Sequence, residues 1–165
     1  MFNSALWFSN FPPEWAVFFL SMIPITELRA AVPIGITVYD LPVWKTWVFA
    51  VMGNLAPTIV LLLVMPYVHD WVIKQKFLGG ILQKKLQDAE NKFSGNYAKY
   101  GAIALVVFVG IPLPLTGAWT GSLAAFIFRI PFKKAFPLIF LGICMSATLV
   151  TLITQFGKGA IGWFL

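Results

Sequence analysis

The chain has 165 residues, of which 59% are hydrophobic and only 11% are charged. With a mean hydropathy of +0.84, it carries more apolar surface than a soluble domain of this length can bury, so the composition excludes a soluble protein and predicts an integral membrane protein. The net charge of +6 gathers between apolar segments, where it reports orientation, and nucleic acid is therefore not an expected partner. The first ten residues contain no Lys or Arg, so no secretory signal peptide is expected.

The first apolar stretch is interrupted by a polar sequence that contains a proline. Residues 15–25 are apolar, but as a helix they are only about 16 Å long, roughly half of a ~30 Å hydrocarbon layer. Pro24 breaks this run, and Thr26 can cap a second half-length helix that begins at Glu27 and ends near Tyr39. Two such helices form either one kinked span or a re-entrant hairpin that enters and leaves by the same side.

The same arrangement recurs in the second half of the chain. Residues 101–111 and 115–128 are two further half-length apolar segments, and Pro112 and Pro114 interrupt the helix between them. The sequence therefore predicts a second hairpin, built like the first but without an ionisable residue at its tip.

Two other apolar segments, residues 44–67 and 136–156, are long enough to cross a membrane as single helices. Between the halves of the chain, residues 70–100 interleave lysines with apolar residues at spacings of three to five. This pattern predicts a basic amphipathic linker helix on the membrane surface, and a solvated linker is the alternative.

Landmarks of the first half recur in the second half at offsets of 88 or 89 residues. Their common order indicates an internal repeat, of the kind from which many transporters are built. The chain is then a single integral membrane domain over residues 1–165, with repeat one at about 14–69 and repeat two at about 101–158. The matching pairs are Ile23-Pro24 with Ile111-Pro112, Leu41-Pro42 with Ile130-Pro131, and Gly53 with Gly142.

Positive charge decides between kinked spans and re-entrant hairpins. If both hairpins are re-entrant, the linker 70–100 and the loop 129–134 lie on one side with nine Lys and Arg residues, against Lys45 and Lys158 on the other. Kinked spans would instead place three of the nine outside, against the positive-inside tendency. We therefore expect the linker and the loop in the cytoplasm and both termini outside, in what is expected to be a prokaryotic plasma membrane.

The expected fold is an all-α polytopic membrane protein with two inverted repeats. Each repeat is a re-entrant helical hairpin followed by one transmembrane helix, and the basic amphipathic helix joins the repeats. The hairpin tips then approach from opposite faces and meet near the middle of the membrane. Helix N-terminal ends at such tips carry partial positive charge and unpaired N–H groups, which suit an anion or a polar head group.

Glu27 and Arg29 are the two ionisable residues at the first predicted tip. A charge at that depth in lipid is costly and usually functional. Glu27 is a candidate for proton coupling, with a structural anchor as the alternative. Arg29 is a candidate for gripping an anionic head group, with satisfying backbone carbonyls as the alternative. Residues two apart on a helix do not face each other, so a direct pair between them requires non-helical backbone.

Other candidates are polar residues that would line a path between the tips and prolines that would break the helices. The threonines are explained equally by capping and by back-bonding within helices. Asn54 would hydrogen-bond the hairpin, and Trp119 would either face an amphiphile or fill the core. The pathway candidates are Thr26, Asn54, Thr116, Trp119 and Thr120, and the helix-break candidates are Pro24, Pro112 and Pro114.

The stretches PITELRAAVPIG, IPLPLTGAWTGSLAA and YAKYG resemble the small multidrug export protein family over nearly the whole chain. That family looks distantly related to the DedA/VTT membrane proteins, a resemblance that implies paired re-entrant hairpins, inverted repeats and movement of lipids between leaflets. DedA-type proteins usually carry arginines around the proline of the second hairpin. This chain has Gly110 and Gly117 there, which leaves Arg29 as the one buried cation.

The sequence contains no catalytic triad pattern, glycine-rich phosphate loop or zinc-ligand spacing, so no enzyme, cofactor or metal is expected. The expected function is transport of a lipophilic or amphipathic small molecule, coupled to protons through Glu27. The alternatives are a lipid or lipid-carrier flippase or scramblase of DedA type, and a non-transporting membrane scaffold subunit. Expected partners are membrane lipid and the amphipathic substrate, and a homodimer would cover part of the apolar side surface.

Overall fold

The structure is a computed structural model that describes residues 12–73, 101–113, 116–128 and 130–164. Within these ranges the chain forms six helices and no strand, which confirms the all-α expectation. Most of the predicted amphipathic linker lies outside the described residues, and so do Pro114 and Arg129.

The first apolar stretch forms two short helices, α1 (Pro13–Met22) and α2 (Glu27–Thr37). The break has a local cause, because Pro24 lacks an N–H group and disfavours helical backbone at the residue before it. Ile23 accordingly adopts extended backbone, with φ −74° and ψ 129°. The predicted interruption is confirmed, and neither helix is long enough to cross a membrane alone.

The second pair of short helices is α5 (Ala102–Gly110) and α6 (Ala118–Ile127). Ile111 precedes Pro112 and has φ −78° and ψ 120°, so the same steric rule ends α5 as ended α1. Gly117 stands before α6 with φ +126°, a left-handed conformation that a side chain would strain. The second predicted interruption is confirmed as well.

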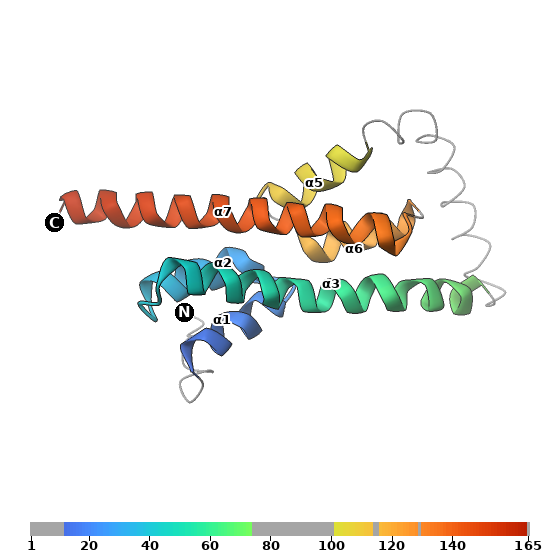
Figure 1. The fold of residues 1–165 in the computed structure, drawn as a ribbon, viewed down its shortest axis with the longest axis horizontal. Helices are drawn as coiled ribbons and strands as arrows, with labels where there is room; N and C mark the ends of the chain where they lie inside the picture. Colours follow the sequence, from blue (N-terminus) through green and yellow to red (C-terminus); the bar gives the residue numbers. More distant parts are fainter. Residues whose placement is uncertain (1–11, 74–100, 114–115, 129, 165) are drawn as a thin grey trace.

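The two remaining helices are long, α3 (Val43–Ile73) and α7 (Phe132–Phe164). Their apolar parts cover 23 residues (Val43–Met65) and 26 residues (Phe132–Gly157), more than the ~20 that a membrane span needs. Both predicted segments are therefore confirmed as helices long and apolar enough to span a membrane. The two helices lie side by side and run in opposite directions (Figure 1).

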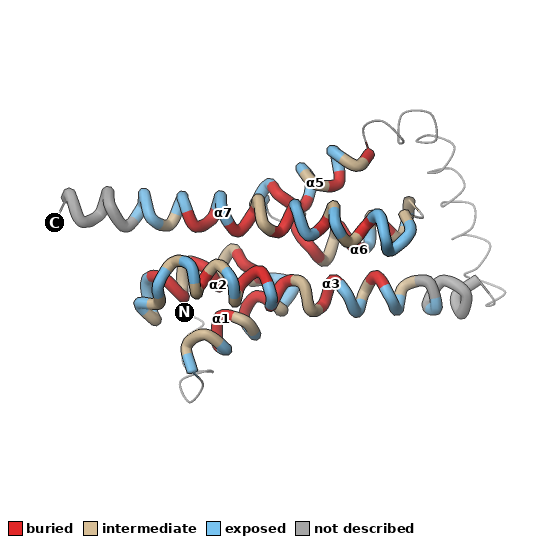
Figure 2. The backbone as a smooth tube through the Cα atoms, viewed as in Figure 1, coloured by how far each residue is buried: buried red, intermediate tan, exposed pale blue. Residues whose placement is uncertain are grey.

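The long helices pack against each other and carry the short helices. α1 packs on α3 and α5 packs on α7, while α2 and α6 each contact both long helices. The α1–α2 turn and the α5–α6 turn point toward one another (Figure 1). Buried positions gather where the helices face each other, and much of the outward surface is exposed (Figure 2). That surface contains many large apolar side chains, including Met52, Leu63, Leu141 and Ile153, as expected for contact with lipid.

A glycine lets each long helix approach the first helix of a pair closely. A Cβ on Gly53 of α3 would collide with the backbone carbonyl of Phe18 in α1. A Cβ on Gly142 of α7 would stand 2.9 Å from the backbone carbonyl of Val106 in α5. Because backbone atoms cannot move aside as a flexible side chain can, both crossings depend on the missing side chain.

We predict that Gly142→Ala destabilises the protein by about 1–3 kcal/mol, since an added methyl in a close-packed contact forces backbone shifts. Gly157→Ala is the matched control, because nothing lies within 4 Å of a Cβ at Gly157 on the same helix. Unfolding of the two variants in mixed detergent micelles measures the difference. Equal stabilities would contradict the close crossing at Gly142.

Candidate functional site

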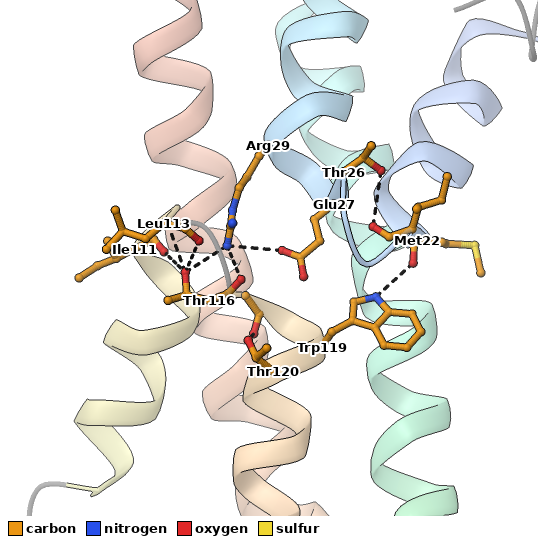
Figure 3. Close-up of polar contacts among 11 residues, drawn as sticks. Met22, Thr26, Glu27, Arg29, Ile111, Leu113, Thr116, Trp119 and Thr120 are labelled. Atoms are coloured by element: carbon orange, nitrogen blue, oxygen red, sulfur yellow. Dashed lines mark hydrogen bonds and ion pairs between the residues drawn. The ribbon is translucent and has the colours of Figure 1, made fainter. Parts of the chain in front are cut away.

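The two tips meet at Glu27, the first residue of α2 (Figure 3). Its side chain is buried, with only 4% of the residue exposed. Its backbone has φ +44°, a left-handed conformation that is uncommon for a residue other than glycine and usually maintained by surrounding contacts. Helical geometry is interrupted at this residue, and its carboxylate lies across from the start of α6.

The Glu27 carboxylate caps α6 from outside that helix. α6 has no side-chain cap of its own, and the backbone N–H of Trp119, in its first turn, donates a hydrogen bond to Glu27. Both carboxylate oxygens lie so close to Gly117 that a Cβ there would collide with them. Because a helix N-terminus has unpaired N–H groups and partial positive charge, an ionised carboxylate stabilises it.

Arg29 joins the same contact from the first turn of α2. Its Nη2 donates to the backbone carbonyl of Thr116 and to Thr116 Oγ1 at 3.1 Å, and lies 3.7 Å from Glu27 Oε2. We expected a direct Glu27–Arg29 pair to need non-helical backbone. Glu27 has a positive φ, which meets that condition. The Nε of Arg29 is buried and has no hydrogen-bond partner among the described residues.

Trp119 completes the contact in the reverse direction. Its indole Nε1 donates to the backbone carbonyl of Met22 at 3.1 Å. Met22 is the last residue of α1, where carbonyls lack partners within the helix. From the sequence, Trp119 was expected either to contact an amphiphile or to fill the core. In the structure it is half-buried and caps the helix of the other pair, so each tip satisfies backbone groups of its counterpart.

The hydroxyl groups of the three candidate threonines contact backbone carbonyls close to them in the sequence. Thr116 Oγ1 lies 2.8 Å from the carbonyl of Ile111 and 2.7 Å from that of Leu113, which closes the second tip. Thr120 Oγ1 donates to the carbonyl of Gly117 at 3.3 Å. The expectation that Thr26 caps α2 with its hydroxyl is wrong, because Thr26 makes no side-chain cap bond.

The reason is the backbone of Thr26 itself. A capping side chain reaches the helix N–H groups from extended backbone, whereas Thr26 has φ −86° and ψ −47°. Its hydroxyl donates back to the carbonyl of Leu20 at 2.8 Å instead. Thr26 therefore holds the two helices of the first tip together.

The remaining candidates lie apart from this contact or shape it indirectly. Asn54 of α3 is buried, with 1% exposed, but its Oδ1 has no hydrogen-bond partner among the described residues. Pro24 and Pro112 stand in the two turns, as predicted. The sequence did not reveal the roles of Met22 and Gly117, since a backbone carbonyl and a missing Cβ leave no signature until the opposite tip is known.

We predict that Gly117→Ala and Glu27→Ala are not additive in stability. Gly117→Ala alone introduces left-handed strain, of about 1–3 kcal/mol, and a collision with the Glu27 carboxylate. With Glu27→Ala already present, the collision disappears, so the second cost is smaller and the coupling is about 0.5–3 kcal/mol. A double-mutant cycle of unfolding in mixed micelles measures this. Simple additivity would show that the two residues do not touch.

Comparison with known proteins identifies one protein family. No curated protein and no solved structure matches the chain. A family profile described as "Putative small multi-drug export protein" matches residues 27–149. The matched region begins at Glu27, just after the α1–α2 turn, and includes the second tip and the crossing glycines Gly53 and Gly142. The family name and the two helices of this chain that are long and apolar enough to span a membrane support a location in a membrane. The chain belongs to this small multidrug export protein family.

Proposed function

We propose that the protein is a membrane transporter of a lipophilic or amphipathic small molecule, coupled to protons through Glu27. The observation that carries the proposal is the tip contact, where a buried carboxylate caps a helix of the other pair. A buried ionisable residue inside an apolar protein is a functional candidate by its cost alone. The family description, small multi-drug export, supports the same class of function.

The proposed architecture is two inverted repeats with re-entrant hairpins at α1–α2 and α5–α6. Three observations support it. The long helices are antiparallel (Figure 1), the packing of α1 on α3 recurs as α5 on α7, and the glycine crossings recur at matched positions. Val106 follows Phe18 by 88 residues and Gly142 follows Gly53 by 89. Positive charge then places the linker 70–100 and the loop 129–134 in the cytoplasm.

Protonation of Glu27 supplies the proposed coupling step. The ionised carboxylate is attracted to Arg29 and to the N-terminus of α6, and a neutral carboxyl loses most of that attraction. A proton on Glu27 therefore weakens the contact that holds the tips together. Opening of the tips to one side and then the other provides alternating access, with the hairpins as moving parts.

The surface beside the contact suits an amphipathic substrate. Ile25 of the first tip is 90% exposed and Leu113 of the second is 55% exposed, and Thr116, which binds Arg29, lies 2.7 Å from the carbonyl of Leu113. The tips therefore offer exposed apolar side chains for an apolar body and polar groups for a head. The same arrangement favours a second candidate, a lipid or lipid-carrier flippase or scramblase of DedA type, in which lipid heads pass the tips.

We predict that purified protein in liposomes moves protons when an amphipathic substrate is added, and that Glu27→Gln abolishes this flux. A pH-sensitive dye inside the liposomes records it. Glu14→Gln is the control, because Glu14 stands at the start of α1, 3.1 Å from Lys45 and away from the tips. Lipid scrambling that ignores a pH gradient would favour the flippase instead. The absence of both proton flux and lipid scrambling would contradict transport and favour a membrane scaffold subunit.

A second prediction concerns topology, and it uses single cysteines introduced after Cys144→Ala, since Cys144 is the only native cysteine. Asp40→Cys should label from outside the cell and Lys133→Cys from the cytoplasm. In the re-entrant arrangement α3 crosses the membrane once between Asp40 and the linker, whereas the α5–α6 hairpin returns the chain to the linker's side before Lys133. An impermeant maleimide applied to cells and to inverted vesicles measures this. Labelling of both positions from the same side would exclude the re-entrant hairpins.

A further inference from the structure

The place that the Glu27 carboxylate occupies has the chemistry of an oxyanion site. Its oxygens face the Cα of Gly117, the N–H of Trp119 and the guanidinium of Arg29. Helix N-termini and a nearby cation together are a common way to bind carboxylates and phosphates. The absence of a side chain at Gly117 leaves room for oxygen atoms against the backbone.

Arg29 has donors that this contact leaves unused. A guanidinium has five N–H donors in a planar fork. The hydrogen bonds and the ion pair found for Arg29 all involve Nη2, and the buried Nε has no partner among the described residues. The 3.7 Å separation from Glu27 Oε2 is also longer than a charge-assisted hydrogen bond. An unpartnered buried donor is uncommon in a folded protein and points to a missing acceptor.

The Arg29 side chain is partly open to the outside, with 23% of it exposed. Ile25 and Leu113, which belong to the two tips, have exposed apolar side chains. In the described parts of the helices packed around Glu27, Arg29 is the charged group that acts on it electrostatically. A head group of negative charge therefore finds one cation and one competing carboxylate.

We propose that the substrate is an amphiphile with an oxyanion head, which binds Arg29 and the N-terminus of α6 in place of the Glu27 carboxylate. This rests on the proposed function and names its substrate class. Two negative groups repel each other at one set of donors, so the head group binds when Glu27 is protonated or displaced. Anion and proton are then taken up together, and binding of each strengthens binding of the other.

The test uses the purified full-length protein in uncharged detergent and two fluorescent probes with the same alkyl chain. One is a dansyl-labelled alkyl sulfonate, whose head stays ionised across the working pH range, and the other is a dansyl-labelled quaternary ammonium. The sulfonate should bind more tightly as pH falls, as measured by fluorescence anisotropy. Binding of the ammonium probe alone would overturn the proposal.

Two variants at the site and one control variant test the proposal further. Glu27→Gln should bind the sulfonate more tightly at neutral pH, by a factor of about 5–150, and should lose the pH dependence. Arg29→Gln should weaken binding, whereas Lys45→Gln, which removes a cation away from the tips, should not. An unchanged sulfonate affinity in Glu27→Gln would overturn the proposal even if Arg29→Gln fails to fold.

Competition identifies the source of the head group. Displacement of the sulfonate by an anionic phospholipid in mixed micelles indicates a lipid head, and displacement by inorganic phosphate indicates a free oxyanion; either supports the site. The liposome assay separates this proposal from the proposed transport. Proton flux driven by the quaternary ammonium without sulfonate binding keeps the transporter and overturns the oxyanion head. Sulfonate binding without proton flux keeps the site and overturns coupled transport.

Discussion

The exchange of caps between the two tips is the interaction on which the remaining structure depends. Breaking a helix leaves backbone N–H and C=O groups without partners, and in lipid no water replaces them. The Glu27 carboxylate accepts from the N–H of Trp119 at the start of α6. The Trp119 indole donates to the carbonyl of Met22 at the end of α1, and Arg29 donates to the carbonyl of Thr116. Neither tip is satisfied alone, so the polar contact that permits two broken helices also joins the halves of the chain.

Features with local causes were predictable from the sequence. An isoleucine followed by a proline ends α1 at Met22 and α5 at Gly110 for a steric reason that acts within two residues. The long helices follow from apolar runs of sufficient length. Part of the site was also predictable, because Glu27 and Arg29 are ionisable residues in an apolar segment. The sequence further indicated that a direct pair between them needs non-helical backbone.

Features with partners far along the chain were not predictable. The hydroxyl of Thr26 was assigned to the wrong partner because the choice depends on its own φ and ψ, which the residue type does not determine. The acceptor for Trp119 is a carbonyl 97 positions away, and every residue has a carbonyl. The need for glycine at Gly117 arises partly from its backbone φ and partly from Glu27, so neither segment alone carries the information.

The contact also explains why two similar tips must differ in chemistry. In the proposed repeat, the offset of 88 or 89 places Leu115 or Thr116 where the first tip has Glu27. A carboxylate on both tips would bring like charges together at one buried point, and glycines on both would leave α6 without a cap. Complementarity therefore requires one tip to supply charged side chains and the other to supply open backbone. A consequence is that protonation of a single residue acts on the whole junction, which a symmetric pair of tips would not permit.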